Sequence, residues 1–202
     1  QVIYLYFLLS ECFDSYQVRS LGNGLDNTLW KYYSQDLQNG IYSAEEIREF
    51  FRYFLMQWSA IGNYWGQPLY LGGTNLDGST KYNELSLLIL DVYDELNIYN
   101  PKIQIKVNDN TPDAVLFKLL DMIRKGHNSF VFCCEPGMIH AVMTYGATYE
   151  EALNMDIRGC YETGIRANEV STETGYINMS KTVEYALYNG YDRTIGKEFG
   201  LR

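Results

Sequence analysis

Apolar residues recur at helical spacing along some segments of the chain and at strand-like spacing along others. Helical spacing predicts helices over residues 1–16, 28–40, 43–65, 79–101, 111–126, 148–159 and 176–190. Short apolar or alternating runs predict strands over residues 67–73, 102–108 and 129–134. Because strands alternate with helices from about residue 67 to residue 160, the pattern favours βα units and a parallel sheet or barrel, which is an α/β fold class.

Local signals set the expected ends of these helices. Ser43 with Glu46 three residues later is typical of a capping box at a helix start. Thr111 is the expected N-cap of the helix over 111–126, with a proline in its first helical position. Pro101 is the expected end of the helix over 79–101, and Gly126 that of the helix over 111–126.

The composition is that of a globular protein. The 202 residues are 47% hydrophobic and 20% charged, with 19 tyrosines, which suit packed cores and pocket walls. The net charge of −9 without a basic run argues against nucleic acid as a partner. The apolar run at the N-terminus is too short to span a membrane and lacks the basic flank of a signal peptide, so no membrane partner and a cytoplasmic location are expected.

The four cysteines, at positions 12, 133, 134 and 160, form no C-x-x-C pair. Cys133 and Cys134 lie near His127 and His140, which raises the alternative of a zinc site. Adjacent residues on a strand point to opposite faces, however, whereas zinc requires ligands that converge. Buried strand residues, with neither metal nor a mutual disulfide, are therefore the favoured interpretation of this pair.

Cys160 follows Gly159 and lies two positions before Glu162, in the sequence "RGCYE". A nearby carboxylate raises the pKa of a thiol, which disfavours a thiolate nucleophile. A thiol that loses a hydrogen atom instead of a proton is not impaired, and the carboxylate can then act as a general base. The alternative is a buried cysteine beside a surface glutamate. We expect Cys160 to lie on a loop after a helix that ends near Arg158.

Several ordered segments resemble the glycyl radical enzymes of the pyruvate formate-lyase-like superfamily. They are listed in chain order: "SLGNGLDNTLWKYY", "GGTNLDGSTKYNELSLLILD", "TPDAVLFKLLDMIRKG", "RGCYE" and "NMSKTVEYALYNGYDRTIGKEFG". The resemblance implies a ten-stranded α/β barrel made of two half-barrels, with the active cysteine on a finger loop inside it. It also implies a radical stored on a glycine near the C-terminus. No R-V-x-G-[YF] loop of that kind occurs in residues 1–202, so we expect these residues to be a partial barrel domain with a helix-rich N-terminal portion.

The resemblance assigns the radical cysteine to Cys160. In the family this cysteine precedes the N-[LM]-[AS]-K helix by a little under twenty residues, and Cys160 lies 18 positions before Asn178. Formate-lyases carry two adjacent catalytic cysteines, which makes "FCCE" the alternative, but Cys134 lies 44 positions before Asn178. The G-C-x-E pattern is similar to that of the dehydratases, C–N and C–S lyases and arylacetate decarboxylases. It implies that a Cys160 thiyl radical abstracts a substrate hydrogen and that Glu162 is the general base, before water, an amine, sulfite or CO2 leaves.

The sequence departs from this pattern around the implied substrate site. Diol-type relatives carry a His-Ser pair where this chain has Gln17 and Val18. They also carry an aspartate after G-C-x-E, where Glu173 or Thr174 stands here, and Tyr161 replaces a small aliphatic residue. Gln17, Tyr161, Glu173 and Thr174 are therefore the candidate substrate-binding residues. These changes argue against a glycerol- or propanediol-type substrate and leave room for an aromatic or otherwise unusual one.

The resemblance also implies partners. A small-molecule substrate and a separate iron–sulfur, S-adenosylmethionine-dependent activase that installs the glycyl radical are expected, under anaerobic conditions. No bound cofactor or metal is expected, and family members are usually homodimers. The alternative from another functional class is a non-catalytic barrel fragment that serves as a structural or binding module, which the missing glycyl loop suggests.

Overall fold

The computed structural model of the protein describes residues 5, 24–60, 68–159, 162–166 and 177–199. It divides into two compact units, residues 1–169 and 170–202. In chain order the first unit contains α2 (Leu25–Gln38), α3 (Ala44–Ala60), β1 (Leu69–Leu71), α4 (Glu84–Leu96), β2 (Ile103–Val107), α5 (Asp113–Arg124), β3 (Phe130–Cys134), α6 (Glu135–Thr144), α7 (Tyr149–Leu153), β4 (Met155–Arg158) and β5 (Glu162–Ile165).

The centre of the first unit is a parallel sheet in the order β1-β2-β3. Tyr70 is in register with Gln104, and Gln104 with Val131. Helices α4 and α5 connect the strands, as parallel strands require. The predicted α/β class and its parallel pairing are therefore confirmed.

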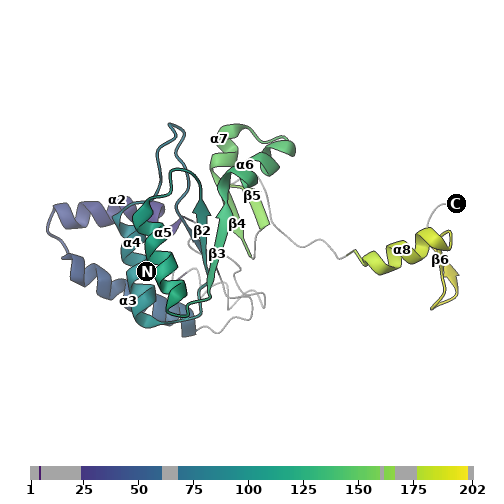
Figure 1. Ribbon diagram of the computed structural model, residues 1–202, viewed down its shortest axis with the longest axis horizontal. Helices are drawn as coiled ribbons and strands as arrows, with labels where there is room; N and C mark the ends of the chain where they lie inside the picture. Colours follow the sequence, from purple (N-terminus) through teal and green to yellow (C-terminus); the bar gives the residue numbers. More distant parts are fainter. Residues whose placement is uncertain (1–4, 6–23, 61–67, 160–161, 167–176, 200–202) are drawn as a thin grey trace. The chain divides into compact units, whose positions relative to one another are not determined.

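The two faces of this sheet differ in chemistry. Leu69, Leu71, Ile103 and Ile105 are each 0% exposed and belong to the main core with helices α2 to α5, which lie on one side of the sheet in Figure 1. Successive strand residues alternate between faces, so Tyr70, Gln104 and Lys106 of β1 and β2 lie on the other face. We call this second face the inner face.

A β-hairpin packs against the inner face. Strands β4 and β5 are antiparallel, with Met155 paired to Ile165 and Arg158 paired to Glu162. Ile157 is 0% exposed and packs with Tyr70 and Cys133 of the sheet. Figure 1 shows the hairpin with α6 and α7 on the side of the sheet opposite to α2–α5. The hairpin and α6 are elements that the sequence pattern did not predict.

The helix starts show which local signals decide the fold. The capping box at Ser43 is confirmed, because its hydroxyl accepts from the Glu46 amide at 3.2 Å and the Glu46 carboxylate accepts from the Ser43 amide at 2.8 Å. Thr111 is not the N-cap of α5, since Pro112 takes that position. The Thr111 hydroxyl instead accepts from the Asn108 amide at 2.9 Å, which closes the turn after β2.

Two predicted helices end earlier than expected. Helix α4 ends at Leu96, ahead of Pro101, because Asn97 adopts a left-handed conformation with φ of 48°. The helix expected to reach Arg158 ends at Leu153, although its Thr148 capping box is present. Residues 155–158 form β4 instead, because Met155 and Ile157 alternate at strand spacing and both bury completely.

The second unit contains α8 (Met179–Leu187), β6 (Tyr191–Asp192) and β7 (Lys197–Glu198). Its polar centre is Asp192, whose carboxylate accepts from Lys181 Nζ at 3.0 Å and from Tyr185 Oη at 2.9 Å. Burial raises the pKa of Asp192, but these hydrogen bonds outweigh burial and hold the pKa at about 2. Across both units, none of the helices that the structure describes is long and apolar enough to cross a membrane.

Candidate functional site

Lys106 fixes the start of the hairpin to the inner face. It is 1% exposed, and its Nζ donates to the Met155 carbonyl oxygen at 2.8 Å. The ammonium also lies 4.3 Å from the ring centroid of Tyr70, a cation–π contact. Burial lowers the pKa of Lys106 to about 8, while the negative charge of Glu135 acts in the opposite direction.

A second attachment joins β1 to both strands of the hairpin. The Tyr70 hydroxyl donates to Asp156 Oδ1 at 3.0 Å. Arg166, which follows β5, donates to Asp156 Oδ1 at 2.8 Å and to Tyr70 Oη at 2.7 Å. Burial raises the pKa of Tyr70 far above its usual value, so the hydroxyl stays protonated. The three side chains therefore clamp the hairpin to the sheet.

A third attachment reaches the far end of β4. Gln104 is 1% exposed, and its Nε2 donates to the carbonyl oxygen of Gly159 at 3.0 Å. Gly159 has a φ of 55°, a left-handed conformation that favours glycine. The sheet therefore holds the hairpin along its length, from Met155 to the residue that precedes Cys160.

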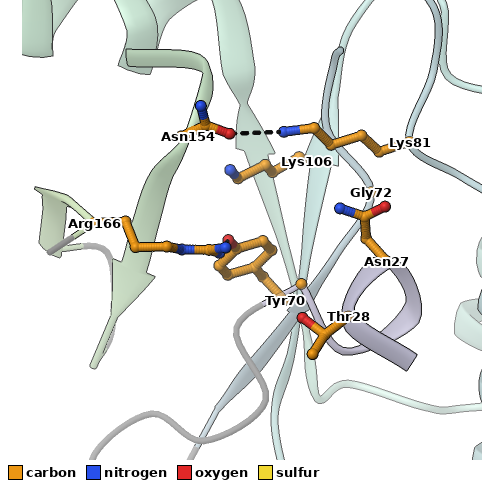
Figure 2. A pocket seen from close by; sticks show the side chains of 9 residues that line it. Asn27, Thr28, Tyr70, Gly72, Lys81, Lys106, Asn154 and Arg166 are labelled. Carbon is orange, nitrogen blue, oxygen red and sulfur yellow. Dashed lines mark hydrogen bonds between the residues drawn. The ribbon is translucent and has the colours of Figure 1, made fainter. Parts of the chain in front are cut away.

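The hairpin base, the sheet and the start of α2 line a polar pocket, shown in Figure 2. Its lining residues are Gly24, Asn27, Thr28, Tyr70, Gly72, Lys81, Lys106, Asn154 and Arg166. Lys81 Nζ donates to the Leu153 carbonyl at 3.3 Å and approaches Asn154 Oδ1 at 3.5 Å. Burial lowers the pKa of Lys81 as it does that of Lys106. The three cationic side chains of this pocket, Lys81, Lys106 and Arg166, therefore all donate to residues 153–156 at the start of the hairpin.

Glu135 joins the loops that follow the three parallel strands. It is 0% exposed, and its carboxylate accepts from the Thr74 amide at 3.1 Å, the Thr74 hydroxyl at 2.6 Å and Asn108 Nδ2. Gly73 packs beside it, because a β-carbon on that residue would lie 3.1 Å from Glu135 Oε1. The carboxylate therefore ties the ends of β1, β2 and β3 together.

Glu162 is the first residue of β5 and is exposed. Its carboxylate lies beside Gly159, since a β-carbon on that glycine would come within 2.6 Å of Glu162 Oε2. Cys160 and Tyr161 separate Gly159 from Glu162 in the chain and lie outside the described residues. The candidate substrate-binding residues Gln17, Glu173 and Thr174 also lie outside them. Of the predicted catalytic pair, the structure therefore describes Glu162 alone, at the start of β5 and paired with Arg158 of β4.

Cys133 and Cys134 lie at the end of β3 as free thiols, so their expected place on a strand is confirmed. Cys133 is 2% exposed and packs on the inner face, and burial raises its pKa to about 11. Cys134 is exposed. Within the described part of the chain, no three His, Cys, Asp or Glu residues gather in a way that could hold a metal ion.

Sequence reasoning missed the residues that hold the hairpin. A signal was present in "KIQIKVN", where Gln104 and Lys106 are polar residues two positions apart on a strand. Such a pair predicts one polar face, and a strand whose neighbours are covered on both sides must satisfy that face with internal partners. The acidic partner Asp156 lay in a segment predicted as helix, so its position opposite Tyr70 could not be anticipated.

The chain is similar in sequence to proteins of one enzyme family over most of its length. The family model for pyruvate formate lyase-like proteins matches residues 1–202. Trans-4-hydroxy-L-proline dehydratase of Clostridioides difficile is 30% identical over 88% of the chain, and isethionate sulfite-lyase of Bilophila wadsworthia is 26% identical over 88%. The chain spans 24% and 23% of these relatives, respectively, about a quarter of their length.

Two solved structures have the same fold over most of the chain. A glycyl radical enzyme from Archaeoglobus fulgidus superposes with a TM-score of 0.77, at 26% identity, over 91% of this chain and 26% of that one. Hydroxyproline dehydratase of Clostridioides difficile superposes with a TM-score of 0.73, at 28% identity, over 89% of this chain and 25% of that one. The described α/β elements are therefore a segment of such a barrel.

Proposed function

Because the chain belongs to the pyruvate formate lyase-like family of glycyl radical enzymes, we propose that it supplies the cysteine loop of a glycyl radical lyase or dehydratase. The observation that carries this proposal is the β4–β5 hairpin, which bears G-C-x-E at its turn and is held against the inner face of the sheet. The relatives named above are a dehydratase and a sulfite-lyase, which supports the same reaction class.

The stored radical supplies the one-electron chemistry. A separate S-adenosylmethionine-dependent activase would install it elsewhere in the complete protein. Cys160 gives its thiol hydrogen atom to that radical and becomes a thiyl. The thiyl then takes a hydrogen atom from a substrate carbon. At the end of the cycle the Cys160 thiol returns this hydrogen atom to the product radical and becomes the thiyl again. The thiyl then takes a hydrogen atom back from the storage glycine, which restores both the thiol and the stored radical.

Glu162 accepts a proton from a hydroxyl or carboxyl group of the substrate radical. The negative charge left on oxygen promotes departure of a neighbouring group with its electron pair. Sulfite or an amine leaves directly, and hydroxide leaves as water when the protonated Glu162 returns its proton to it, whereas a substrate carboxylate loses CO2 and leaves its electron pair on the carbon. Glu162 is suited to this role because it is exposed at the turn and lies next to Gly159. The sheet contributes by holding Cys160 and Glu162 in one geometry.

The proposal is tested with the complete protein, activated without oxygen by its activase. Product formation is assayed with trans-4-hydroxy-L-proline, isethionate and 4-hydroxyphenylacetate, and the radical is counted by electron paramagnetic resonance. Cys160→Ser should keep the radical signal and lose all turnover, because a serine O–H bond is too strong to give up its hydrogen atom. Cys134→Ser is the matched control and should retain turnover. Turnover that survives Cys160→Ser, or an activated protein without a radical signal, would contradict the proposal.

A further inference from the structure

Gln104 links the sheet to the turn that carries the proposed radical cysteine. Its Nε2 donates to the Gly159 carbonyl oxygen at 3.0 Å, and with an exposure of 1% the amide has little water to compete for it. The Gly159 carbonyl belongs to the peptide group that also contains the nitrogen of Cys160. That group is planar and rigid, so fixing its oxygen fixes the direction in which the chain enters Cys160.

We propose that Gln104 is a positioning residue, which sets the place of the Cys160 thiol through the Gly159 carbonyl. The inference rests on the proposed function of Cys160. It extends that function by identifying a residue, 56 positions earlier in the chain, on which the efficiency of hydrogen-atom transfer depends.

The other attachments of the hairpin act at a different place. Lys106 holds the Met155 carbonyl and Tyr70 holds Asp156, so both act at the start of β4. Gln104 acts at its far end, at Gly159. Removing the Gln104 amide should therefore loosen the turn while the start of the strand remains attached.

The expected consequence is kinetic. Hydrogen-atom transfer requires the sulfur to approach the donor or acceptor carbon closely, and a displacement of about 1 Å at a reacting group can cost about 10²-fold in rate. Loss of a single hydrogen bond is a small fraction of the net stability of a folded protein. Gln104 variants should accordingly fold and acquire the radical, yet transfer hydrogen atoms slowly.

The test follows the radical itself, so no substrate is needed. The activated complete protein is transferred to D2O, where the Cys160 thiol exchanges its hydrogen with solvent. Deuterium then reaches the glycine α-carbon by transfer to and from Cys160, and the hydrogen-split doublet of the resonance signal collapses to a singlet. We expect Gln104→Leu to slow this collapse by about tenfold or more. Tyr70→Phe, which removes a hydroxyl bond at the start of β4, should change the rate by less than about threefold.

The outcomes separate the two proposals. If Cys160→Ser shows exchange at the unaltered rate, Cys160 is not the transferring group and the proposed function itself is wrong. If Cys160→Ser blocks exchange but Gln104→Leu exchanges at the unaltered rate, only the role of Gln104 is wrong. If Gln104→Leu and Tyr70→Phe slow the deuterium exchange equally, the positioning role of Gln104 is also contradicted. The slowing would then come from a general loosening of the hairpin. Should Gln104→Leu not accumulate in folded form, Gln104→Met, which keeps the length of the side chain, carries the same test.

Discussion

Gly159 and Glu162 pack so closely that a β-carbon on residue 159 would lie 2.6 Å from Glu162 Oε2 and 3.2 Å from its carboxyl carbon. The backbone of Gly159 is also left-handed, with a φ of 55°. Glycine is therefore required before Cys160 for two reasons. The backbone there is left-handed, and a side chain at residue 159 would displace the Glu162 carboxylate.

Gly159→Ala separates these two constraints. The left-handed backbone alone should cost about 1 kcal/mol of unfolding free energy. Gly40→Ala is the matched control, since Gly40 has a φ of 63° and nothing within 4 Å of an added β-carbon. Denaturant titrations should give similar losses for both variants, whereas turnover per radical should fall only in Gly159→Ala, because its methyl group displaces the Glu162 carboxylate. Equal turnover in the two variants would show that the carboxylate position does not matter.

Glu162→Gln keeps the size of the side chain and removes the base. We expect the radical yield and the deuterium exchange of the radical to be unchanged, since neither requires a proton acceptor. Turnover should fall by about 10²–10⁴-fold, the usual contribution of a general base. Glu150→Gln, on the exposed surface of α7, is the control and should be indistinguishable from the unaltered protein. Near-native turnover of Glu162→Gln would remove Glu162 from the mechanism.

The parallel sheet could be predicted from the sequence because its strands are short, apolar and separated by well-capped helices. The segment over 102–108 shows this most clearly, since Ile103 and Ile105 alternate with polar residues and point into the helical layer. Family motifs indicated the proposed catalytic pair in the same way, because Cys160 and Glu162 stand close together in the chain.

The hairpin could not be predicted, because what stabilises it is distant in sequence. Residues 155–158 follow a capped helix, and only contacts with the sheet show that they form a strand. The bond from Gln104 to Gly159 spans 55 residues and that from Tyr70 to Asp156 spans 86. Hydrophobic periodicity within one segment does not predict such distant pairs, so the residues that hold the hairpin could be identified only from the structure.

Lys106 should make the stability of the protein depend on alkaline pH. Its pKa is about 8 in the folded protein and 10.5 when unperturbed, so between these values the unfolded chain binds more protons. The contribution of Lys106 is therefore fully present above about pH 10.5 and is lost as the pH falls through about 8. Relative to Lys106→Met, the unaltered protein should gain melting temperature from pH 8 to pH 10. A difference between the two proteins that stays constant over this range would contradict the lowered pKa.

Glu135 should contribute more to stability than any exposed carboxylate of this unit. Glu135→Ala leaves the half-buried Thr74 amide without its acceptor and removes one of the two acceptors of Asn108 Nδ2, the other being the Thr74 hydroxyl. It also removes the negative charge that acts most strongly on Lys106. We expect a loss of about 3 kcal/mol, the usual cost of breaking a buried charged network.

The control for this prediction is Glu150→Ala, which makes the same substitution on the exposed surface of α7 and should cost less than about 0.5 kcal/mol. Glu135→Gln retains one acceptor oxygen for Thr74 and should lie between the two. Calorimetric melting temperatures of the complete protein measure all three. If Glu135→Ala melts together with Glu150→Ala, the carboxylate does not hold the strand ends together, and the sheet must be stabilised by its apolar face alone.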